Sequence, residues 1–244
     1  MSFRRVLSSF NNIADCFFGM RFQPSSEARL SKVRMRLIEE FECDTVIDVG
    51  ANAGQWARKL RKSGYLDKII SYEPSNVFHE LKENAKGDFL WSVKQEGLSD
   101  YSGIAPLYIA SNNGLSSSFL KPKEILNQHS QIKFDQEIKT PVRRLDQDVF
   151  NSNRIYLKID TQGSEYQVLR GAERMLSNIS IIEFESALIQ LYEGETNHYF
   201  IASWLIENGF EPVQVVATHW DRGFTTISID AIFVKVSSQE IKME

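Results

Sequence analysis

The segment DTVIDVGANAGQW, residues 44–56, most constrains how this chain can fold. A short apolar run leads directly into a turn that contains Gly50, Asn52 and Gly54. Glycine adopts left-handed backbone angles at little cost, and asparagine tolerates them better than most other residues. The segment therefore predicts a strand, a tight turn and the N-terminus of a helix, which together form a cradle for a small ligand.

Two acidic residues narrow the choice of ligand. Asp48 precedes the turn, whose G-x-N-x-G spacing differs from the G-x-G-x-x-G spacing that serves a pyrophosphate. A carboxylate there repels a pyrophosphate and suits an ammonium group. Glu73 ends the next apolar run, at the distance where an acid accepts both hydroxyls of a ribose. An ammonium group and a ribose outline S-adenosylmethionine; an ordinary strand-to-helix turn with a solvated aspartate is the alternative.

Apolar runs and amphipathic helices alternate along most of the chain. Residues 68–72, 89–93, 155–159 and 179–185 resemble buried strands, and residues 25–41, 55–62 and 196–208 carry helical periodicity. The runs at 210–217 and 229–236 have no long helix between them, so we expect them to pair antiparallel. The alternation predicts an α/β fold with a mostly parallel sheet and helices on both faces.

Residues 101–144 interrupt this alternation. They contain strand-like runs at 104–109 and 138–142, separated by the stretch SNNGLSSSF, which has no periodicity and is typical of a loop. Loops on a rigid α/β scaffold often carry substrate contacts. A disordered insertion is the alternative that composition leaves open.

Composition excludes several classes of protein. A length of 244 residues fits one α/β domain with insertions, and a net charge of −4 argues against nucleic acid as the main partner. The basic clusters at 29–36 and 58–62 are predicted to be solvated helix faces. Two cysteines are too few for a disulfide framework, which favours a reducing, cytoplasmic location. The sequence has no apolar run of about 20 residues that could span a membrane. Residues 1–40 are predicted to be a helical extension that packs on the domain or on a partner subunit.

Several motifs in order resemble one family. DVGANAGQW, YEP, GLSD, KIDTQGSEYQVLRGA, FESALIQLYEGE and IDAIFVK resemble the FkbM-type methyltransferases, which are S-adenosylmethionine-dependent O-methyltransferases of the seven-stranded class. The resemblance covers residues 41–236 and implies a Rossmann-like seven-stranded sheet, mostly parallel with an antiparallel final strand. It also implies one methyltransferase domain, residues 41–244, with inserted strands and a loop at about 101–144.

The resemblance implies a set of site residues. Asp48, Gly50, Asn52 and Gly54 would hold the methionine end of the cofactor, and Glu73 its ribose. The adenine would be flanked by Pro74, Ser75, Gly97 and Leu98. Ser117, Ser118, Tyr192 and Asp230 would contact the acceptor, although Tyr192 could equally be a packing residue.

Two acids follow strands that converge at the carboxyl edge of the expected sheet. Methyl transfer to a hydroxyl needs a group that takes its proton. We expect Asp160 to be that base, or to position the acceptor, with Glu185 as its partner; which of Glu183 and Glu185 faces the site stays open. No metal ligands are assigned, and a divalent metal between the carboxylates is allowed but not required. Alternatively, Asp160 caps the next turn or orients the cofactor's ammonium group.

These expectations lead to a specific hypothesis. The protein would methylate a hydroxyl of a glycan or a nucleotide-linked sugar, as in polysaccharide biosynthesis, and could form a homo-oligomer. The alternatives are O-methylation of a macrolide or another secondary metabolite, and a non-catalytic S-adenosylmethionine-binding partner subunit. The spacing of Gly50 and Gly54, together with Asp48, argues against a nicotinamide-dependent oxidoreductase.

Overall fold

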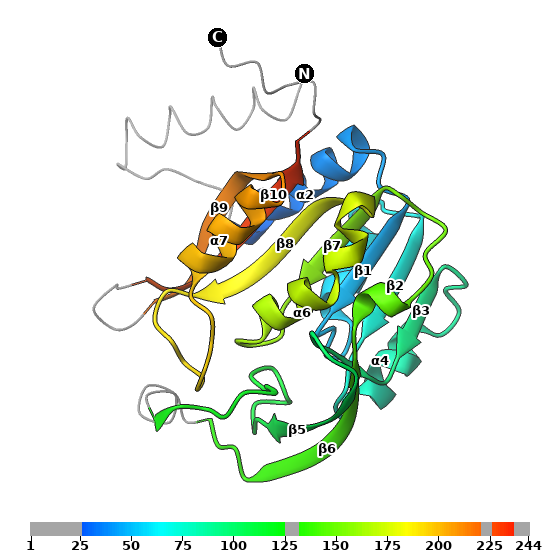
Figure 1. The fold of residues 1–244 in the computed structure, drawn as a ribbon. Helices are drawn as coiled ribbons and strands as arrows, with labels where there is room; N and C mark the ends of the chain where they lie inside the picture. The colour runs from blue at the N-terminus through cyan, green and yellow to red at the C-terminus, as the bar shows by residue number, and fades with distance from the viewer. Residues whose placement is uncertain (1–25, 125–131, 221–225, 237–244) are drawn as a thin grey trace, which may run out of the picture.

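A computed structural model describes residues 26–124, 132–220 and 226–236. The first 25 residues, which include most of the expected N-terminal extension, lie outside the described part. The described chain contains one large sheet, one small sheet and helices on both faces of the large sheet (Figure 1).

The large sheet has seven strands in the order β3-β2-β1-β7-β8-β10-β9. All neighbouring pairs from β3 to β8 are parallel, whereas β10 is antiparallel to both β8 and β9. This confirms the predicted α/β fold with an antiparallel final strand. The strands are β1 (Thr45–Val49), β2 (Lys68–Tyr72), β3 (Trp91–Lys94), β7 (Ile155–Ile159), β8 (Ile179–Ala187), β9 (Phe210–Trp220) and β10 (Thr226–Lys235).

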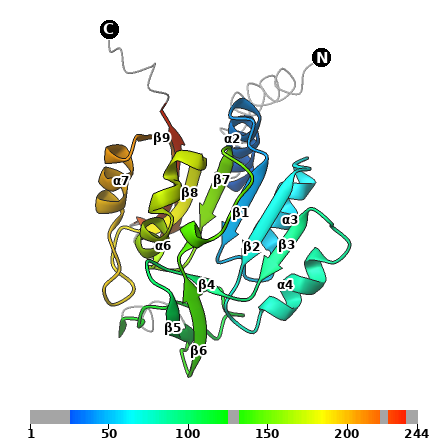
Figure 2. The same ribbon diagram turned by 45° about the vertical axis from the view of Figure 1, so that its right-hand side comes forward.

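Two groups of helices cover the large sheet from opposite sides (Figure 2). On one face Leu30, Leu60 and Leu81 pack on Val46 and Ile69 of the sheet. These residues come from helices α2 (Ser26–Glu40), α3 (Gln55–Lys62) and α4 (Phe78–Ala85). The other face is covered by α6 (Glu165–Gly171) and α7 (His198–Glu207), with the 3-10 helices η1 (Leu145–Gln147) and η2 (Glu173–Asn178) nearby.

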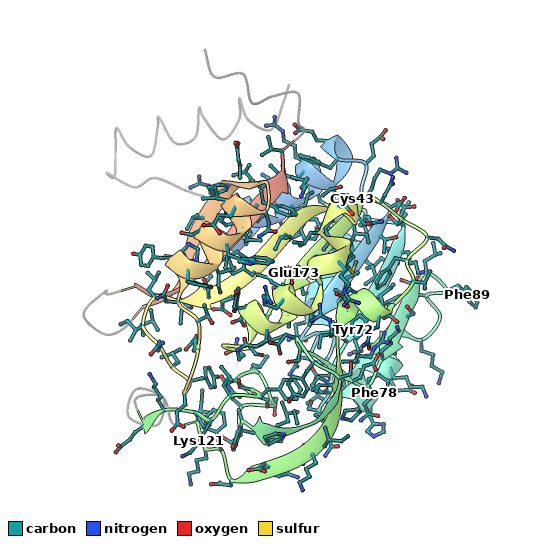
Figure 3. The ribbon with its side chains drawn as sticks, in the orientation of Figure 1. Cys43, Tyr72, Phe78, Phe89, Lys121 and Glu173 are labelled. Atoms are coloured by element: carbon teal, nitrogen blue, oxygen red, sulfur yellow. The ribbon has the colours of Figure 1, made fainter. Side chains whose placement is uncertain are left out.

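Strand β3 begins two residues later than the apolar run predicts. Phe89 is fully exposed and projects from the molecule, whereas Tyr72 lies inside it (Figure 3). The turn before β3 is held by Asp88, whose Oδ1 accepts a hydrogen bond from Leu90 N at 3.0 Å. The first buried residue of the strand is Trp91, whose Nε1 donates to Ser71 Oγ at 3.0 Å.

The expected insertion forms a second, three-stranded sheet, here called the annex sheet. It consists of β4 (Gly97–Leu98), β5 (Gly103–Ile109) and β6 (Gln136–Arg143) in the order β4-β6-β5. In Figure 1 this sheet lies beyond one end of the strands of the large sheet. Gly97 and Leu98 therefore belong to the annex sheet and do not end the third strand of the large sheet.

One basic residue of α2 contradicts the prediction of a solvated face. Arg36 has a side chain 82% exposed, as expected, but Arg34 is only 4% exposed. Arg34 lies four residues after Leu30 and three before Leu37, so helical periodicity places it on the buried stripe. Among the described residues, none of the helices is both long and apolar enough to cross a membrane.

Candidate functional site

A cavity of about 270 Å³ opens where β1, β2, β7 and β8 end and the annex sheet begins. Ligands of open α/β sheets bind at this carboxyl edge of the strands. Most of the predicted site residues line it, namely Gly50, Asn52, Glu73, Pro74, Gly97, Leu98, Ser117, Ser118, Asp160, Glu185 and Asp230.

The turn after β1 has the expected left-handed conformation. The φ angles of Gly50, Asn52 and Gly54 are 76°, 49° and 80°. A Cβ atom on Gly50 would lie 1.9 Å from the carbonyl oxygen of Asp160, so only glycine fits between the turn and the end of β7. On Gly54 it would collide with Leu81 and Trp91, which makes Gly54 a packing residue beneath the cavity.

Glu73 joins the turn to the end of β2. Its Oε2 accepts a hydrogen bond from Asn52 N at 2.8 Å, and its Oε1 accepts one from Ser75 N at 2.8 Å. A carboxylate accepts about four hydrogen bonds, so two acceptor positions are left for ligand hydroxyls. Ser75 is buried and does not line the cavity, so its observed part is to hold Glu73.

The predicted reaction-centre acids are joined by a glutamine. Gln162 Nε2 donates to Asp160 Oδ1 at 2.8 Å and to Glu185 Oε2 at 3.3 Å. Glu185 Oε1 also accepts hydrogen bonds from Thr218 Oγ1 at 3.2 Å and from Ser228 Oγ at 2.9 Å. The amide thus fixes two carboxylates side by side at the edge of the cavity.

Glu165 shapes the turn that carries Gln162. Its carboxylate accepts hydrogen bonds from Thr161 N at 3.0 Å and from Gly163 N at 3.0 Å. Gln162 and Gly163 have φ angles of 54° and 103°. Burial raises the pKa of Glu165 to about 8. Glu165, and not Asp160, therefore accepts the backbone hydrogen bonds of this turn. The side chain of Gln162 points back and donates to Asp160.

Asp48, Lys158 and Glu183 form a row of charged side chains beneath these acids, here called the buried charge row. Lys158 and Glu183 precede Asp160 and Glu185 by two residues on their strands. Strand register aligns Asp48 with Lys158 and Lys158 with Glu183. Lys158 Nζ lies 3.2 Å from Asp160 Oδ2 and 3.6 Å from Asp48 Oδ1. Burial alone lowers the pKa of Lys158, but Asp160 and Asp48 outweigh it and raise the pKa.

Asp48 and Tyr192 do not line the cavity. Asp48 is fully buried and accepts a hydrogen bond from Ser71 Oγ at 3.2 Å, so it reaches the cavity only through Lys158. Tyr192 is 2% exposed and its hydroxyl donates to Ser116 O at 2.8 Å. Its hydroxyl thus ties the 191–195 segment to the Ser/Asn loop.

Glu183 and Glu185 both face the cavity, because they lie two residues apart on one face of β8. Glu183 is buried beneath Glu185 and forms an ion pair with Arg34. Asp230 lies opposite Glu185 on β10. Burial and the nearby charges of Glu183 and Glu185 raise the pKa of Asp230 to about 8.

The Ser/Asn loop is ordered and forms one wall of the cavity. Ser117 Oγ accepts a hydrogen bond from Ala110 N at 3.0 Å, and Ser118 Oγ donates to Gln162 O at 2.7 Å. Ser118 therefore also supports the turn that carries Gln162. Residues 125–131, farther along the insertion, lie outside the described part.

Within residues 26–124, 132–220 and 226–236, His, Cys, Asp and Glu side chains form no group of three or more that could hold a metal ion. The position between Asp160 and Glu185 is taken by the Gln162 amide. A divalent metal between these carboxylates stays allowed but not required.

Sequence reasoning missed Gln162, Lys158 and Arg34. Each charged member of the buried charge row stands inside an otherwise apolar strand, which was a usable signal of a buried ionic layer. The role of Gln162 depends on the left-handed turn after β7, and residue spacing alone does not reveal which way its side chain turns.

The donor and acceptor groups of the cavity fit S-adenosylmethionine. Glu73 has acceptor positions for a ribose, and only glycine fits at position 50 beside the cavity. Trp56 also lines the cavity, and its buried Nε1 has no hydrogen-bond partner within the described chain. This indole suits an acceptor such as the carboxylate of the methionine moiety.

The chain is similar to several known methyltransferases. The 2-O-methyltransferase NoeI of Sinorhizobium fredii is 24% identical over 183 residues, which cover 71% of this chain and 75% of NoeI. The N-methyltransferase NodS from Bradyrhizobium japonicum superposes with a TM-score of 0.49 at 10% identity, covering 86% of this chain and 97% of NodS. Magnesium protoporphyrin IX methyltransferase from Synechocystis, solved with bound SAM, gives a TM-score of 0.47 at 12% identity, covering 96% of each chain. The family model "Methyltransferase FkbM domain" matches residues 48–212, and this chain therefore belongs to the FkbM family of S-adenosylmethionine-dependent methyltransferases.

Proposed function

We propose that this chain transfers the methyl group of S-adenosylmethionine to a hydroxyl group of a sugar, in a glycan or a nucleotide-linked acceptor. The observation that carries the proposal is the pair Asp160 and Glu185, held together by Gln162 at the cavity beside the Gly50 turn. A relative described as a 2-O-methyltransferase supports oxygen as the acceptor atom.

The cofactor half of the cavity would bind through Glu73 and the turn. Glu73 accepts the ribose hydroxyls, while Gly50 and Asn52 hold the methionine end by their backbone. Pro74, Gly97 and Leu98 enclose the adenine. Bound in this way, S-adenosylmethionine supplies an electrophilic methyl group on a sulfonium.

Asp160 would take the proton of the acceptor hydroxyl. Gln162 fixes Asp160 through Oδ1, which keeps the carboxylate in one orientation while the acceptor approaches. Glu185, oriented by Thr218 and Ser228, accepts a hydrogen bond from a neighbouring hydroxyl of the sugar. Ser117 and Asp230 supply further contacts to the acceptor.

The lining of the acceptor side favours a sugar over a macrolide. The annex side contributes Ser117 and Ser118, and the sheet contributes Asp160, Glu185 and Asp230. These side chains offer hydrogen-bond partners to several hydroxyls of a sugar, and the apolar Leu107 and Phe119 on the annex side can contact one face of a sugar ring. A sugar acceptor would make this an enzyme of polysaccharide biosynthesis; the cytoplasmic location and a homo-oligomer stay predictions.

The test uses purified protein and S-adenosylmethionine with a labelled methyl group. The acceptors are a panel of methyl glycosides, nucleotide sugars and one macrolide, and mass spectrometry of the products locates the label. We expect a methyl ether on a glycoside or a nucleotide sugar. Transfer to the macrolide alone would refute the preference for sugars.

Asp160→Asn should lower turnover by about 10² to 10⁴-fold, the usual contribution of a positioned general base. Its affinity for S-adenosylhomocysteine should change by less than about threefold, because Glu73 and the turn are intact. Asp67→Asn, at an exposed position, is the matched control. Tight S-adenosylhomocysteine binding without turnover of any acceptor by the wild type would instead support a non-catalytic subunit.

A further inference from the structure

Helix α2 lies before residues 48–212, the part of the chain that matches the family domain, yet it reaches the reaction centre. Arg34 is buried and lines the cavity. Its guanidinium lies 5.1 Å from the centre of the Trp56 ring, and Lys158 Nζ lies 5.9 Å from the same ring. The two cations thus share one aromatic neighbour below the predicted acceptor side.

Arg34 binds both oxygens of one carboxylate. Its Nε donates to Glu183 Oε2 at 2.8 Å and its Nη2 donates to Glu183 Oε1 at 2.6 Å. Tyr156 also donates its hydroxyl to Glu183. Burial raises the pKa of Glu183, but the charge and hydrogen bonds of Arg34, together with the Tyr156 hydroxyl and the Lys158 charge, outweigh burial and hold the pKa below its usual value. Glu183 is therefore a buried anion that depends on Arg34.

Glu183 and Asp160 are both neighbours of Lys158. Strand register places Glu183 beside Lys158 on β8, and the Glu183 charge acts on the Lys158 ammonium. Lys158 Nζ is directed instead to Asp160 Oδ2 and Asp48 Oδ1. A buried carboxylate without a cation attracts any ammonium within reach, because an unpaired buried charge costs several kcal/mol.

We propose that Arg34 is a positioning residue for methyl transfer: by holding both oxygens of Glu183, it leaves the Lys158 ammonium directed at Asp160. The inference rests on the role proposed above for Asp160. The ion pair of Lys158 Nζ with Asp160 Oδ2 at 3.2 Å holds the Asp160 carboxylate in one orientation at the acceptor side of the cavity. The titratable and charged groups around Asp160 are Asp48, Lys158, Glu165, Glu183, Glu185, Asp230 and, through Glu183, Arg34.

Arg34→Met tests the proposal first by crystallography of the full-length variant. Glu183 loses its cation, so Lys158 Nζ should move to hydrogen-bond distance of Glu183 and leave Asp160. If Lys158 stays on Asp160, the proposal is overturned, whether or not an acceptor has been identified. Arg36→Met, on the exposed side of the same helix, is the control and should leave Lys158 in place.

The kinetic test uses the acceptor selected from the panel above. A positioned general base usually contributes about 10² to 10⁴-fold to the rate, and a misplaced one loses part of this, so Arg34→Met should lower kcat by about 10 to 100-fold. Affinity for S-adenosylhomocysteine should change by less than about threefold; a tenfold loss would mean that Arg34 serves the cofactor and would overturn the proposal.

A second substitution separates positioning from packing. Arg34→Met with Glu183→Gln removes the competing anion together with the cation, so Lys158 should return to Asp160 and most of kcat should recover. A double variant no better than Arg34→Met would show that Arg34 acts by packing. If Arg34→Met does not fold, Arg34→Gln, which is also uncharged, gives the same comparison with and without Glu183→Gln. A wild type that methylates nothing in the panel refutes the proposed function, and the position of Lys158 still decides this inference.

Discussion

Gly50→Ala tests the contact on which the cofactor half of the site depends. The φ angle of Gly50 is 76°, so an alanine there costs about 1 to 2 kcal/mol in backbone strain. Its Cβ would also lie 1.9 Å from Asp160 O, whereas ordinary contacts begin at 3.4 Å, so the turn and the end of β7 must separate. Overpacking of this kind adds about 1 to 3 kcal/mol.

Gly64→Ala is the matched control. Gly64 also has a positive φ angle, 105°, but a Cβ there would have no atom within 4 Å. The control therefore carries the backbone strain without the collision. Urea denaturation should show Gly50→Ala to be less stable than Gly64→Ala by about 1 to 3 kcal/mol, which is the collision alone.

Calorimetry with S-adenosylhomocysteine gives the second readout. Because the displaced turn carries Asn52, whose backbone N–H is held by Glu73, we expect Gly50→Ala to bind at least about tenfold more weakly, or about 1.4 kcal/mol. Gly64→Ala should bind within about twofold of wild type. Equal stability of the two variants, together with wild-type affinity for Gly50→Ala, would falsify the claim that the close approach of Gly50 to Asp160 shapes the cofactor site.

Two further predictions use the carboxylates of the cavity. Glu73→Gln replaces one acceptor oxygen by a donor, so S-adenosylhomocysteine should bind about 10 to 100-fold more weakly, since hydrogen bonds to a charged group contribute about 1.5 to 3 kcal/mol. The control Glu80→Gln, at an exposed position, should leave the affinity unchanged. Equal affinities of the two variants would contradict the assignment of Glu73 to the ribose. The pKa of Asp230 is about 8 in the folded protein and lies near 3.8 without burial. Between these values the folded state binds the additional proton, so the contribution of Asp230 to stability is present at low pH and lost as pH rises toward 8. Asp230→Asn should therefore gain stability relative to wild type from pH 5 to pH 8 in urea denaturation, and a pH-independent difference would refute the reasoning.

The local hydrophobic pattern of the sequence predicts most of the fold. The alternation of apolar runs and amphipathic helices predicts the strands β1, β2, β7 and β8 and the final antiparallel pair, because each element buries its own apolar residues against its neighbours. It does not predict where a strand begins. Phe89 is as apolar as Trp91, and only the turn at Asp88 and the Trp91 to Ser71 hydrogen bond decide between them.

The site was less accessible to sequence reasoning, because its contacts join distant residues. Asp160, Glu185 and Glu73 are predictable, since Glu73 and Asp160 directly follow β2 and β7, and Glu185 lies near the end of β8 at the same edge of the sheet. Gln162 and Arg34 are not, because one depends on a left-handed turn and the other on the register between a helix and β8. Charge misleads at Arg34, where helical spacing and residue type point to opposite sides of α2.

The cavity is lined by residues from two separate sheets. Glu73, Asp160 and Glu185 come from the large sheet, whereas Leu107, Ser117 and Phe119 come from β5 and the loop that follows it. Strand β5 is buried on one side only, and it pairs with β6 rather than with any strand of the large sheet. Residues 103–124 could therefore diverge without disturbing the strands that carry the acids. Related enzymes are expected to change acceptor by remodelling this appendage while their chemistry is inherited unchanged.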